Sequence, residues 1–387
     1  MDSIDYQSLL KHYSQFQNSN FLDRYINYEE LENYLKNDIF SFFDYDTIGY
    51  SELNKPIYSV DIGNGPKKIL VWSQMHGNET TTTKAILDFL NYIKFDKSNS
   101  FIDYFLNTCQ LKIIPVLNPD GSSNYTRFNA NEVDLNRDAI HRSQKETKHF
   151  FTALETFKPD YCFNMHGQRT IFSAGKQNKP ATLSFLAPSY NDNLNINKSR
   201  EEAMKLIIAA NEMLSDFIPN QIGRYDDAHN PNCFGDQIQK MGIPTVLFEA
   251  GHYPGDYNRN ETRKLVKLSL VKMLECISYS NFDEFNLEDY NTIPKNEELY
   301  LDVIIKNIKN SDSGYIGIQY NEILEENKIV FKPYIKITGD LSNFHAHRLI
   351  DANYKPIKIN KKSKYNVDQI IENIKIGSDV IDLKIVK

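Results

Sequence analysis

Residues 69–95, ILVWSQMHGNETTTTKAILDFLNYIKF, carry the pattern that decides the fold. The first seven residues form a short apolar run, which predicts a buried strand. From Thr80 to Phe95 the apolar residues recur at helical spacing behind a run of threonines, which predicts an amphipathic helix. Between the two lies HGNE, residues 76–79. The stretch therefore predicts a strand that leads into a helix, with polar side chains at the carboxyl end of the strand.

The same alternation continues along the chain. Apolar runs recur at 111–117, 161–165 and 244–250, and helical patterns at 199–217 and 260–277. Apolar strands that alternate with helices favour an α/β sheet covered by helices on both faces.

Composition divides the chain into three parts. Residues 1–55 are polar with apolar residues at helical spacing, so we expect an N-terminal helical segment that packs on the next part. Residues 56–284 hold the alternating strands and helices of an α/β domain. Residues 285–387 contain alternating polar and apolar segments, which predict a small β-rich C-terminal domain.

The overall composition describes a folded, mildly acidic chain. Its 387 residues are 41% hydrophobic, enough for a sizeable core, which excludes wholesale disorder. The balance of 44 Lys and Arg against 51 Asp and Glu gives a net charge of -7. That charge argues against a nucleic-acid binder, which needs a basic surface to displace counterions. No stretch approaches the roughly 18 consecutive apolar residues of a membrane span, so no membrane partner is expected.

The expected location rests on the cysteines and on the first residues. The cysteines lie far apart and in no paired spacing: Cys109, Cys162, Cys233 and Cys276. This pattern is typical of buried thiols in a reducing compartment. The opening MDSIDYQSLLKHYSQFQ lacks the basic and apolar regions of a secretory signal. We therefore expect a cytoplasmic protein.

Four residues that follow or end apolar runs indicate a metal site. His76 and Glu79 form an HxxE pair on one helical turn, His166 follows the run at 161–165, and Glu249 lies within the run at 244–250. In open α/β sheets ligands bind at the carboxyl ends of strands. Two histidines and a carboxylate suit a catalytic zinc ion, and a second carboxylate can serve as general base. On its own, Glu249 is also compatible with a carboxylate that forms an ion pair at a strand end.

Four ordered motifs carry a resemblance to a known family. They are HGNE (76–79), NPDGSSNYTRFNANEVDLNRD (118–138), NMHG (164–167) and LFEAG (247–251). Together they resemble the M14 family of zinc metallocarboxypeptidases, over roughly residues 60–280. The resemblance implies a mixed central sheet flanked by helices, with residues 56–284 as the catalytic domain and the β-rich region as a C-terminal appendage.

The resemblance also implies the central chemistry. His76, Glu79 and His166 would ligate zinc, with one ion per chain. Glu249 would be the general base that takes a proton from water and then the acid that protonates the departing amine.

Further roles follow from the resemblance for the segment at 118–138. Arg127 would polarise the scissile carbonyl and stabilise the oxyanion, a role that suits preorganised positive charge. Asn136 and Arg137 would hold the terminal carboxylate of the substrate, and a guanidinium offers two donors for that purpose. Asp134 would orient the imidazole of His76.

Some positions depart from the family pattern and bear on the substrate. Asn78 stands where the digestive members usually have an arginine, so one carboxylate-binding subsite is changed. Tyr225 is our candidate for the mobile tyrosine of the family, and Tyr253 is a poorer second. Asp236 would select a basic terminal residue or pin its own loop, while Arg169 would favour an acidic group.

These observations predict a zinc metallocarboxypeptidase that hydrolyses the C-terminal amide bond of a peptide or peptide-like substrate. The expected partner is a substrate with a free terminal carboxylate, with no nucleic acid and no membrane. One alternative is a zinc amidohydrolase of the aspartoacylase and succinylglutamate desuccinylase type, which deacylates N-acyl amino acids and whose metal motif also reads HGNE. The other is a carboxypeptidase-like binding protein without catalysis.

Overall fold

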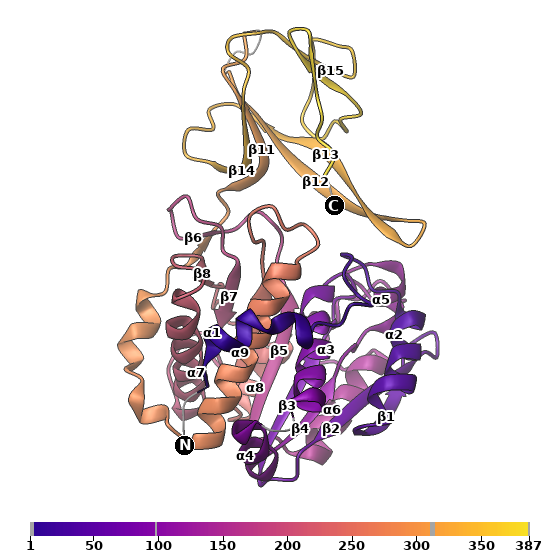
Figure 1. The fold of residues 1–387 in the computed structure, drawn as a ribbon, viewed down its shortest axis with the longest axis vertical. Helices are drawn as coiled ribbons and strands as arrows, with labels where there is room; N and C mark the ends of the chain where they lie inside the picture. Colours follow the sequence, from indigo (N-terminus) through magenta and orange to yellow (C-terminus); the bar gives the residue numbers. More distant parts are fainter. Residues whose placement is uncertain (1–3, 97–98, 310–313, 386–387) are drawn as a thin grey trace.

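A large mixed sheet forms the centre of the protein (Figure 1). The computed structural model describes residues 4–96, 99–309 and 314–385. Eight strands lie in the order β1-β2-β4-β3-β5-β9-β7-β8. They are β1 (Asp44–Tyr50), β2 (Pro56–Ile62), β3 (Lys67–Ser73), β4 (Cys109–Ile114), β5 (Tyr161–Gly167), β7 (Leu183–Leu186), β8 (Ile222–Arg224) and β9 (Thr245–Ala250).

The inner strands of this sheet run parallel. β3 pairs in parallel with β4 and β5, and β5 pairs in parallel with β9. β1 and β2 join antiparallel at one side, and β7 joins β9 antiparallel at the other. Because parallel strands end at the same edge, the residues that follow β3, β5 and β9 are brought together.

Helices cover both faces of the sheet, as the alternation of strands and helices predicted. The side chains of β3 alternate between two hydrophobic clusters: Ile69 and Val71 pack with α3 and α9, and Leu70 and Trp72 pack with α6 and α8. The helices that follow β2 are α3 (Thr80–Phe95), α4 (Ser100–Thr108), α5 (Pro119–Asn124), α6 (Lys145–Phe157), α7 (Lys198–Ser215), α8 (Phe234–Lys240) and α9 (Asn260–Tyr279), with the 3-10 turn η3 (Leu135–Arg137). This two-sided burial explains why the inner strands read as continuous apolar runs.

The N-terminal part is helical only in its first portion. It contains α1 (Tyr6–Lys11), η1 (Tyr13–Gln15), α2 (Tyr28–Tyr34) and the π-helical turn η2 (Leu35–Ile39). The expectation of a helical segment up to residue 55 is wrong for its end, because Asp44–Tyr50 forms strand β1 at the edge of the sheet. This strand is mostly exposed, so no apolar run marked it. Its pairing with β2 is what makes it a strand.

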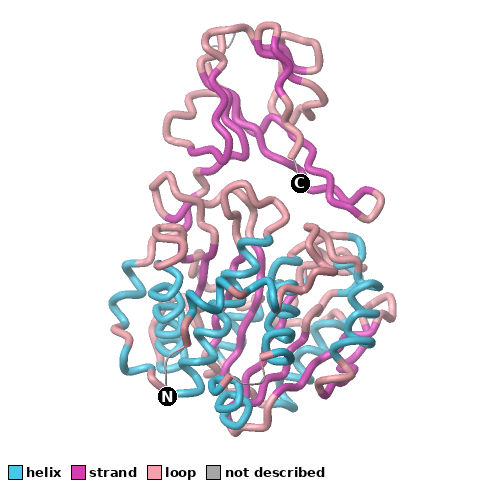
Figure 2. Tube along the Cα trace, viewed as in Figure 1, coloured by secondary structure: helices cyan, strands magenta, loops and turns pink. Residues whose placement is uncertain are grey.

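A β-rich part follows α9, as predicted, and contains strands and loops alone in the residues described (Figure 2). One sheet has the order β13-β12-β11-β14, and a second has the order β15-β16-β17. The strands are β11 (Tyr300–Lys306), β12 (Ile316–Glu325), β13 (Lys328–Thr338), β14 (His345–Asp351), β15 (Ile357–Ile359), β16 (Ile374–Ile376) and β17 (Asp379–Ile381). Apolar side chains from both sheets share one core.

The boundary between the α/β part and the β-rich part lies after residue 285, where the sequence predicted it. The turns η4 (Phe282–Glu284) and η5 (Leu287–Thr292) belong to the α/β part, because Phe285, Tyr290 and Ile293 are buried in its larger core. β10 (Asn296–Glu297) then pairs with β6 (Ser173–Ala174), a short strand that follows β5.

Two sequence expectations concern the membrane and the cysteines. In the described ranges, no helix is long and apolar enough to cross a membrane. All the cysteines are free thiols, and Cys109, Cys162 and Cys276 are buried. Cys233 differs, because it is only half-buried and lines the cleft described next.

Candidate active site

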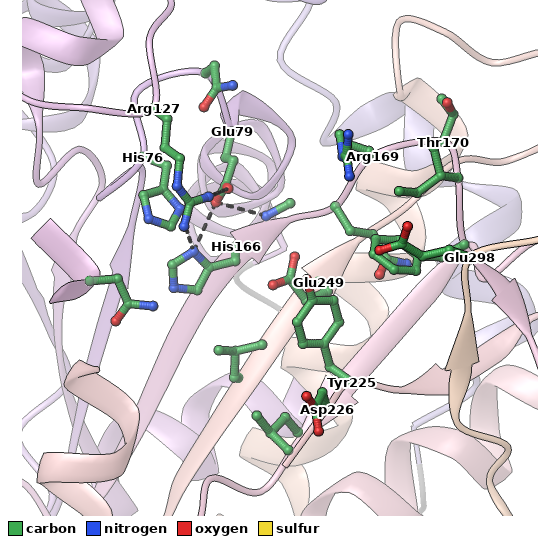
Figure 3. Close-up of a pocket in the computed structure, with 18 of the residues that line it drawn as sticks. His76, Glu79, Arg127, His166, Arg169, Thr170, Tyr225, Asp226, Glu249 and Glu298 are labelled. Carbon is green, nitrogen blue, oxygen red and sulfur yellow. Dashed lines mark hydrogen bonds and ion pairs between the residues drawn. The ribbon is translucent and has the colours of Figure 1, made fainter. Parts of the chain in front are cut away.

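The candidate site lies at the carboxyl edge of the central sheet. β3 leads into His76, β5 contains His166, and β9 contains Glu249. In the pairing of β5 with β9, His166 lies opposite Glu249. Figure 3 shows these side chains around one cleft, with Glu249 between the histidines and Arg169.

Two imidazoles and one carboxylate converge in this cleft. Nδ1 of His76 lies 2.8 Å from one oxygen of Glu79, and Nδ1 of His166 lies 2.9 Å from the other. The two Nδ1 atoms are 3.2 Å apart, and all three side chains are buried. Burial alone would raise the pKa of Glu79, but the imidazoles beside it lower that pKa below its usual value. Two imidazole nitrogens and a carboxylate, with no fourth ligand among the residues that the structure describes, form the donor set of a catalytic zinc site, so the residues fit the ion that the resemblance implies.

The local backbone brings this pair of ligands together. The amide of Glu79 donates to the carbonyl of His76 at 3.1 Å, which closes a turn just before α3. Gly77 within that turn lies against the backbone of Gly121, and a Cβ atom on Gly77 would come within 1.9 Å of it. The glycine of HGNE is therefore required by the close approach of the segment at 118–124.

Asp134 fixes the orientation of His76. Its Oδ1 lies 2.9 Å from Nε2 of His76. An ionised carboxylate only accepts hydrogen bonds, so Asp134 favours a proton on Nε2, which leaves Nδ1 to bind a metal ion. The other oxygen of Asp134 accepts a hydrogen bond from Nε of Arg127 at 3.0 Å and forms an ion pair with its Nη2 at 2.9 Å. Asp134 thus links the ligand His76 to Arg127, whose Nη1 lies 3.7 Å from Glu79.

Glu249 is a buried carboxylate outside the ligand group. Its Oε2 has no hydrogen-bond partner among the described residues. Burial raises the pKa of Glu249 well above its usual value, and the charge of Glu79 raises it further, whereas Arg127 lowers it. A buried, unpaired carboxylate beside a candidate metal site is available for proton transfer rather than for structure, which disfavours the ion-pair reading.

Asn136 and Arg137 line the same cleft. Asn136 accepts a hydrogen bond from the amide of Phe234 at 3.0 Å, which fixes its side chain. Arg137 donates to the carbonyl of Asn136 at 2.7 Å and to the sulfur of Cys233 at 3.1 Å. The start of α8 therefore positions both residues at the cleft.

The remaining candidates from the sequence do not all lie at the cleft. Asn78, Arg169, Tyr225 and Asp236 all line the cleft, whereas Tyr253 packs against the main core. Burial raises the pKa of Tyr225, and the carboxylate of Glu249 raises it further, so the phenol stays protonated. Asp236 accepts a hydrogen bond from the amide of Asn230 at 3.0 Å, and burial raises its pKa to about 6. Asp236 therefore does pin its loop, at a position that also borders the cleft.

Sequence reasoning missed one side of the cleft. The cavity has a volume of about 900 Å³. Besides the residues above, side chains of the N-terminal and C-terminal parts line it: Arg24, Glu298, Asp302, Gln319, Tyr320, Asn321, Glu322, Phe331 and Tyr334. They belong to no motif and come from distant segments, so no local pattern marked them.

Comparison with known proteins finds a family that this chain resembles. The family model of M14, zinc carboxypeptidase, matches residues 28–209, just under half of the chain. Over that segment the chain is similar to the M14 family. The match includes His76, Glu79 and His166 but ends before Glu249.

Curated relatives in this family match only segments of the chain. Carboxypeptidase SOL1 of Arabidopsis thaliana is 27% identical over 190 residues, which are 41% of this chain and 39% of that protein. The gamma-D-glutamyl-L-diamino acid endopeptidase 1 of Lysinibacillus sphaericus is 36% identical over 80 residues, 19% of this chain and 20% of that protein. The chain thus aligns with well under two thirds of the length of either relative.

Solved structures share the fold. A metallo-carboxypeptidase from Burkholderia cenocepacia matches with a TM-score of 0.54 and 16% identity, over 67% of this chain and 71% of that one. Carboxypeptidase A from Helicoverpa armigera matches with a TM-score of 0.54 and 17% identity, over 71% and 80% of the two chains. The predicted mixed sheet flanked by helices is confirmed by the strand order and by these neighbours.

Proposed function

We propose that the protein is a zinc-dependent metallocarboxypeptidase that releases the C-terminal residue of a peptide or peptide-like substrate. The observation that carries the proposal is the convergence of His76, His166 and Glu79 beside the unpaired carboxylate of Glu249. Three ligands and a separate base are the parts that hydrolysis at a metal site requires.

The two histidines and Glu79 would hold one zinc ion per chain. When bound, zinc supplies Lewis acidity, which lowers the pKa of a water molecule and polarises a carbonyl group. Asp134 would keep Nδ1 of His76 unprotonated for this purpose by accepting a hydrogen bond from the protonated Nε2.

Glu249 would carry the proton through the reaction. Its carboxylate takes a proton from the attacking water and then delivers it to the nitrogen of the departing amine. The raised pKa supports the first of these steps, because a carboxylate with a pKa above its usual value is a stronger base.

Arg127 would stabilise the oxyanion that forms on the scissile carbonyl. Its guanidinium is held by Asp134 on one side and lies close to the metal ligands, so its charge is preorganised at that position. Removal of one such donor typically costs about 10²–10³ in kcat.

The terminal carboxylate of the substrate would bind beside Asn136 and Arg137. Asn136 and Arg137 offer amide and guanidinium donors there, and a guanidinium binds a carboxylate through two parallel hydrogen bonds. Tyr225 would close over the bound residue, and Asp236 would border the pocket for its side chain. The cytoplasmic location expected from the cysteines stays a prediction.

Hydrolysis of matched substrates tests the proposal. We expect release of free amino acid from peptides with a free C-terminus, at least about tenfold faster in kcat/KM than from the same peptides with an amidated C-terminus. Preference for N-acyl amino acids would instead identify a deacylating amidohydrolase. Absence of hydrolysis with zinc bound would favour the binding protein without catalysis.

A further inference from the structure

The substrate cleft is shared between the α/β part and the C-terminal β-rich part. One cavity runs from the metal ligands to side chains of β11, β12 and β13. In Figure 1 the hairpin of β12 and β13 extends from the C-terminal part across the top of the α/β part, toward α5. The β-rich part is therefore a neighbour of the site and not a distant appendage.

On one side of the cleft, polar contacts hold the C-terminal part against the α/β part. Gln319 on β12 donates to the hydroxyl of Thr170 at 2.7 Å, four residues after His166. Tyr257 donates to one oxygen of Asp302 at 2.9 Å, and the amide of Tyr320 donates to the other at 2.8 Å. These contacts tie β11 and β12 to the segments that follow β5 and β9.

On the other side of the cleft, further contacts hold the hairpin of β12 and β13. Glu322 on β12 accepts hydrogen bonds from Nε of Arg24, at 3.0 Å, and from the hydroxyl of Tyr125. Burial alone would raise the pKa of Glu322, but Arg24 lowers it, so this carboxylate stays ionised and paired. Tyr25, Tyr125 and Ile329 add a hydrophobic cluster beside the pair. The hairpin thus makes contacts on both sides of the cleft.

The distance from this crossing to the reacting bond is short. Arg24, which pairs with Glu322, also donates from Nη1 to the hydroxyl of Thr81 at 3.1 Å, two residues after the ligand Glu79. Only a few residues on the amino side of the scissile bond can therefore fit before they meet Glu322 and its partners.

We infer that the C-terminal β-rich part is a wall of the substrate cleft and restricts the enzyme to short peptides. This inference rests on the proposed carboxypeptidase function. The terminal residue binds beside Asn136 and Arg137, and the amino end of a short substrate lies against Gln319, Tyr320 and Glu322. A longer chain, or the C-terminus of a folded protein, meets the hairpin.

A series of peptides with one common C-terminal sequence tests the wall. For the full chain with zinc, kcat/KM should fall at least about tenfold from tetrapeptide to octapeptide. N-acetylated peptides should show the same fall, because the limit is one of length and not of recognition of the amino group. Equal kcat/KM for both lengths would overturn the inference while leaving the proposed function intact. Cleavage of neither length would contradict the proposed function itself.

Variants of β12 locate the wall. Glu322→Ala should raise the octapeptide-to-tetrapeptide ratio of kcat/KM by about fivefold or more. The matched control is Glu325→Ala, which removes an exposed glutamate that pairs with Lys332 on the same hairpin, and it should leave the ratio unchanged. The ratio is independent of the fraction of protein that folds.

A second variant shortens the hairpin. It joins Gln319 to Tyr334, which are paired across the two strands, by Asn-Gly, and should raise the ratio further. An unchanged ratio in both Glu322→Ala and the shortened hairpin would overturn the inference.

Discussion

The metal corner and the wall of the same cleft are built in different ways. We call His76, Glu79, His166 and Glu249 the metal corner, and they come from the carboxyl ends of three adjacent parallel strands. The wall joins residues that lie far apart in the sequence, and its pair of Arg24 with Glu322 spans 298 positions. Chemistry is therefore set within one sheet, whereas access is set by how the terminal parts assemble on it.

This difference predicts two kinds of variant. Changes at the metal corner should lower turnover of every substrate by a similar factor, because they act on the reacting bond. Changes at the wall should alter which substrates are accepted. The next three predictions run from the largest expected effect to the smallest.

Replacement of Arg127 should have a large effect that does not depend on peptide length. Arg127→Gln should lower kcat by about 10²–10³, because it removes charge aimed at the oxyanion. Arg142→Gln is a matched control, since Arg142 pairs with Glu155 at the surface. Steady-state kinetics on a tetrapeptide and an octapeptide provide the measurement. A rise in KM alone, with kcat unchanged, would contradict the role given to Arg127.

Replacement of Asp134 should weaken metal binding. Asp134→Asn should reduce zinc affinity by about 10–100-fold, because a neutral amide is a weaker acceptor for the Nε2 proton of His76 and no longer enforces the required tautomer. Titration of the purified protein with a competing chelator measures this directly. As a control, Asp138→Asn alters a neighbouring aspartate that accepts hydrogen bonds from the amides of Ser143 and Gln144. Equal zinc affinity in wild type and Asp134→Asn would show that Asp134 does not orient the ligand.

Low pH should destabilise the contact between the C-terminal part and the α/β part, because His347 lies at that contact. Its Nε2 contacts the carbonyl of Thr170 at 2.8 Å, and its ring packs against His252 and Tyr300. Burial lowers the pKa of His347 to about 4, with a smaller lowering from Arg259. The unfolded state therefore takes up a proton near pH 6.5 and the folded state only near pH 4, so stability falls as pH decreases between these values.

Comparison with a variant that lacks this histidine isolates the contribution of His347 to the pH dependence. Between pH 7 and pH 4, the free energy of unfolding should fall by on the order of 1–3 kcal/mol more in wild type than in His347→Gln. Gln retains a donor for the Thr170 carbonyl but does not titrate. Denaturant unfolding of the full chain at several pH values provides the comparison. Parallel pH profiles for the two proteins would show that His347 does not couple the junction to pH.

The sequence predicted the metal corner better than the rest of the cleft. Apolar runs that end in His166 or contain Glu249 predicted strand ends, and the parallel pairing of β3, β5 and β9 brings those ends together. The contact between Asp134 and His76 was also anticipated and is present. These relations follow from short motifs and from the geometry of a parallel sheet, both of which local patterns encode.

Other features depend on tertiary contacts that no local pattern encodes. β1 lies in a polar stretch and becomes a strand because β2 offers it a partner. The segment 285–293 reads as the start of the β-rich part, yet its apolar side chains are buried in the α/β core. The wall depends on pairs such as Tyr125 with Glu322, 197 positions apart. Each feature is decided by which surfaces meet, and this information is spread over the whole chain.

Glu249→Gln provides the most direct test of the central claim, that a separate carboxylate beside the three ligands carries the proton in hydrolysis. Zinc content and kcat on a tetrapeptide should be measured on the same purified sample. We expect zinc to stay close to one ion per chain while kcat falls by about 10²–10⁴-fold, because glutamine neither accepts nor returns the proton. Undiminished hydrolysis by zinc-loaded Glu249→Gln would contradict the account.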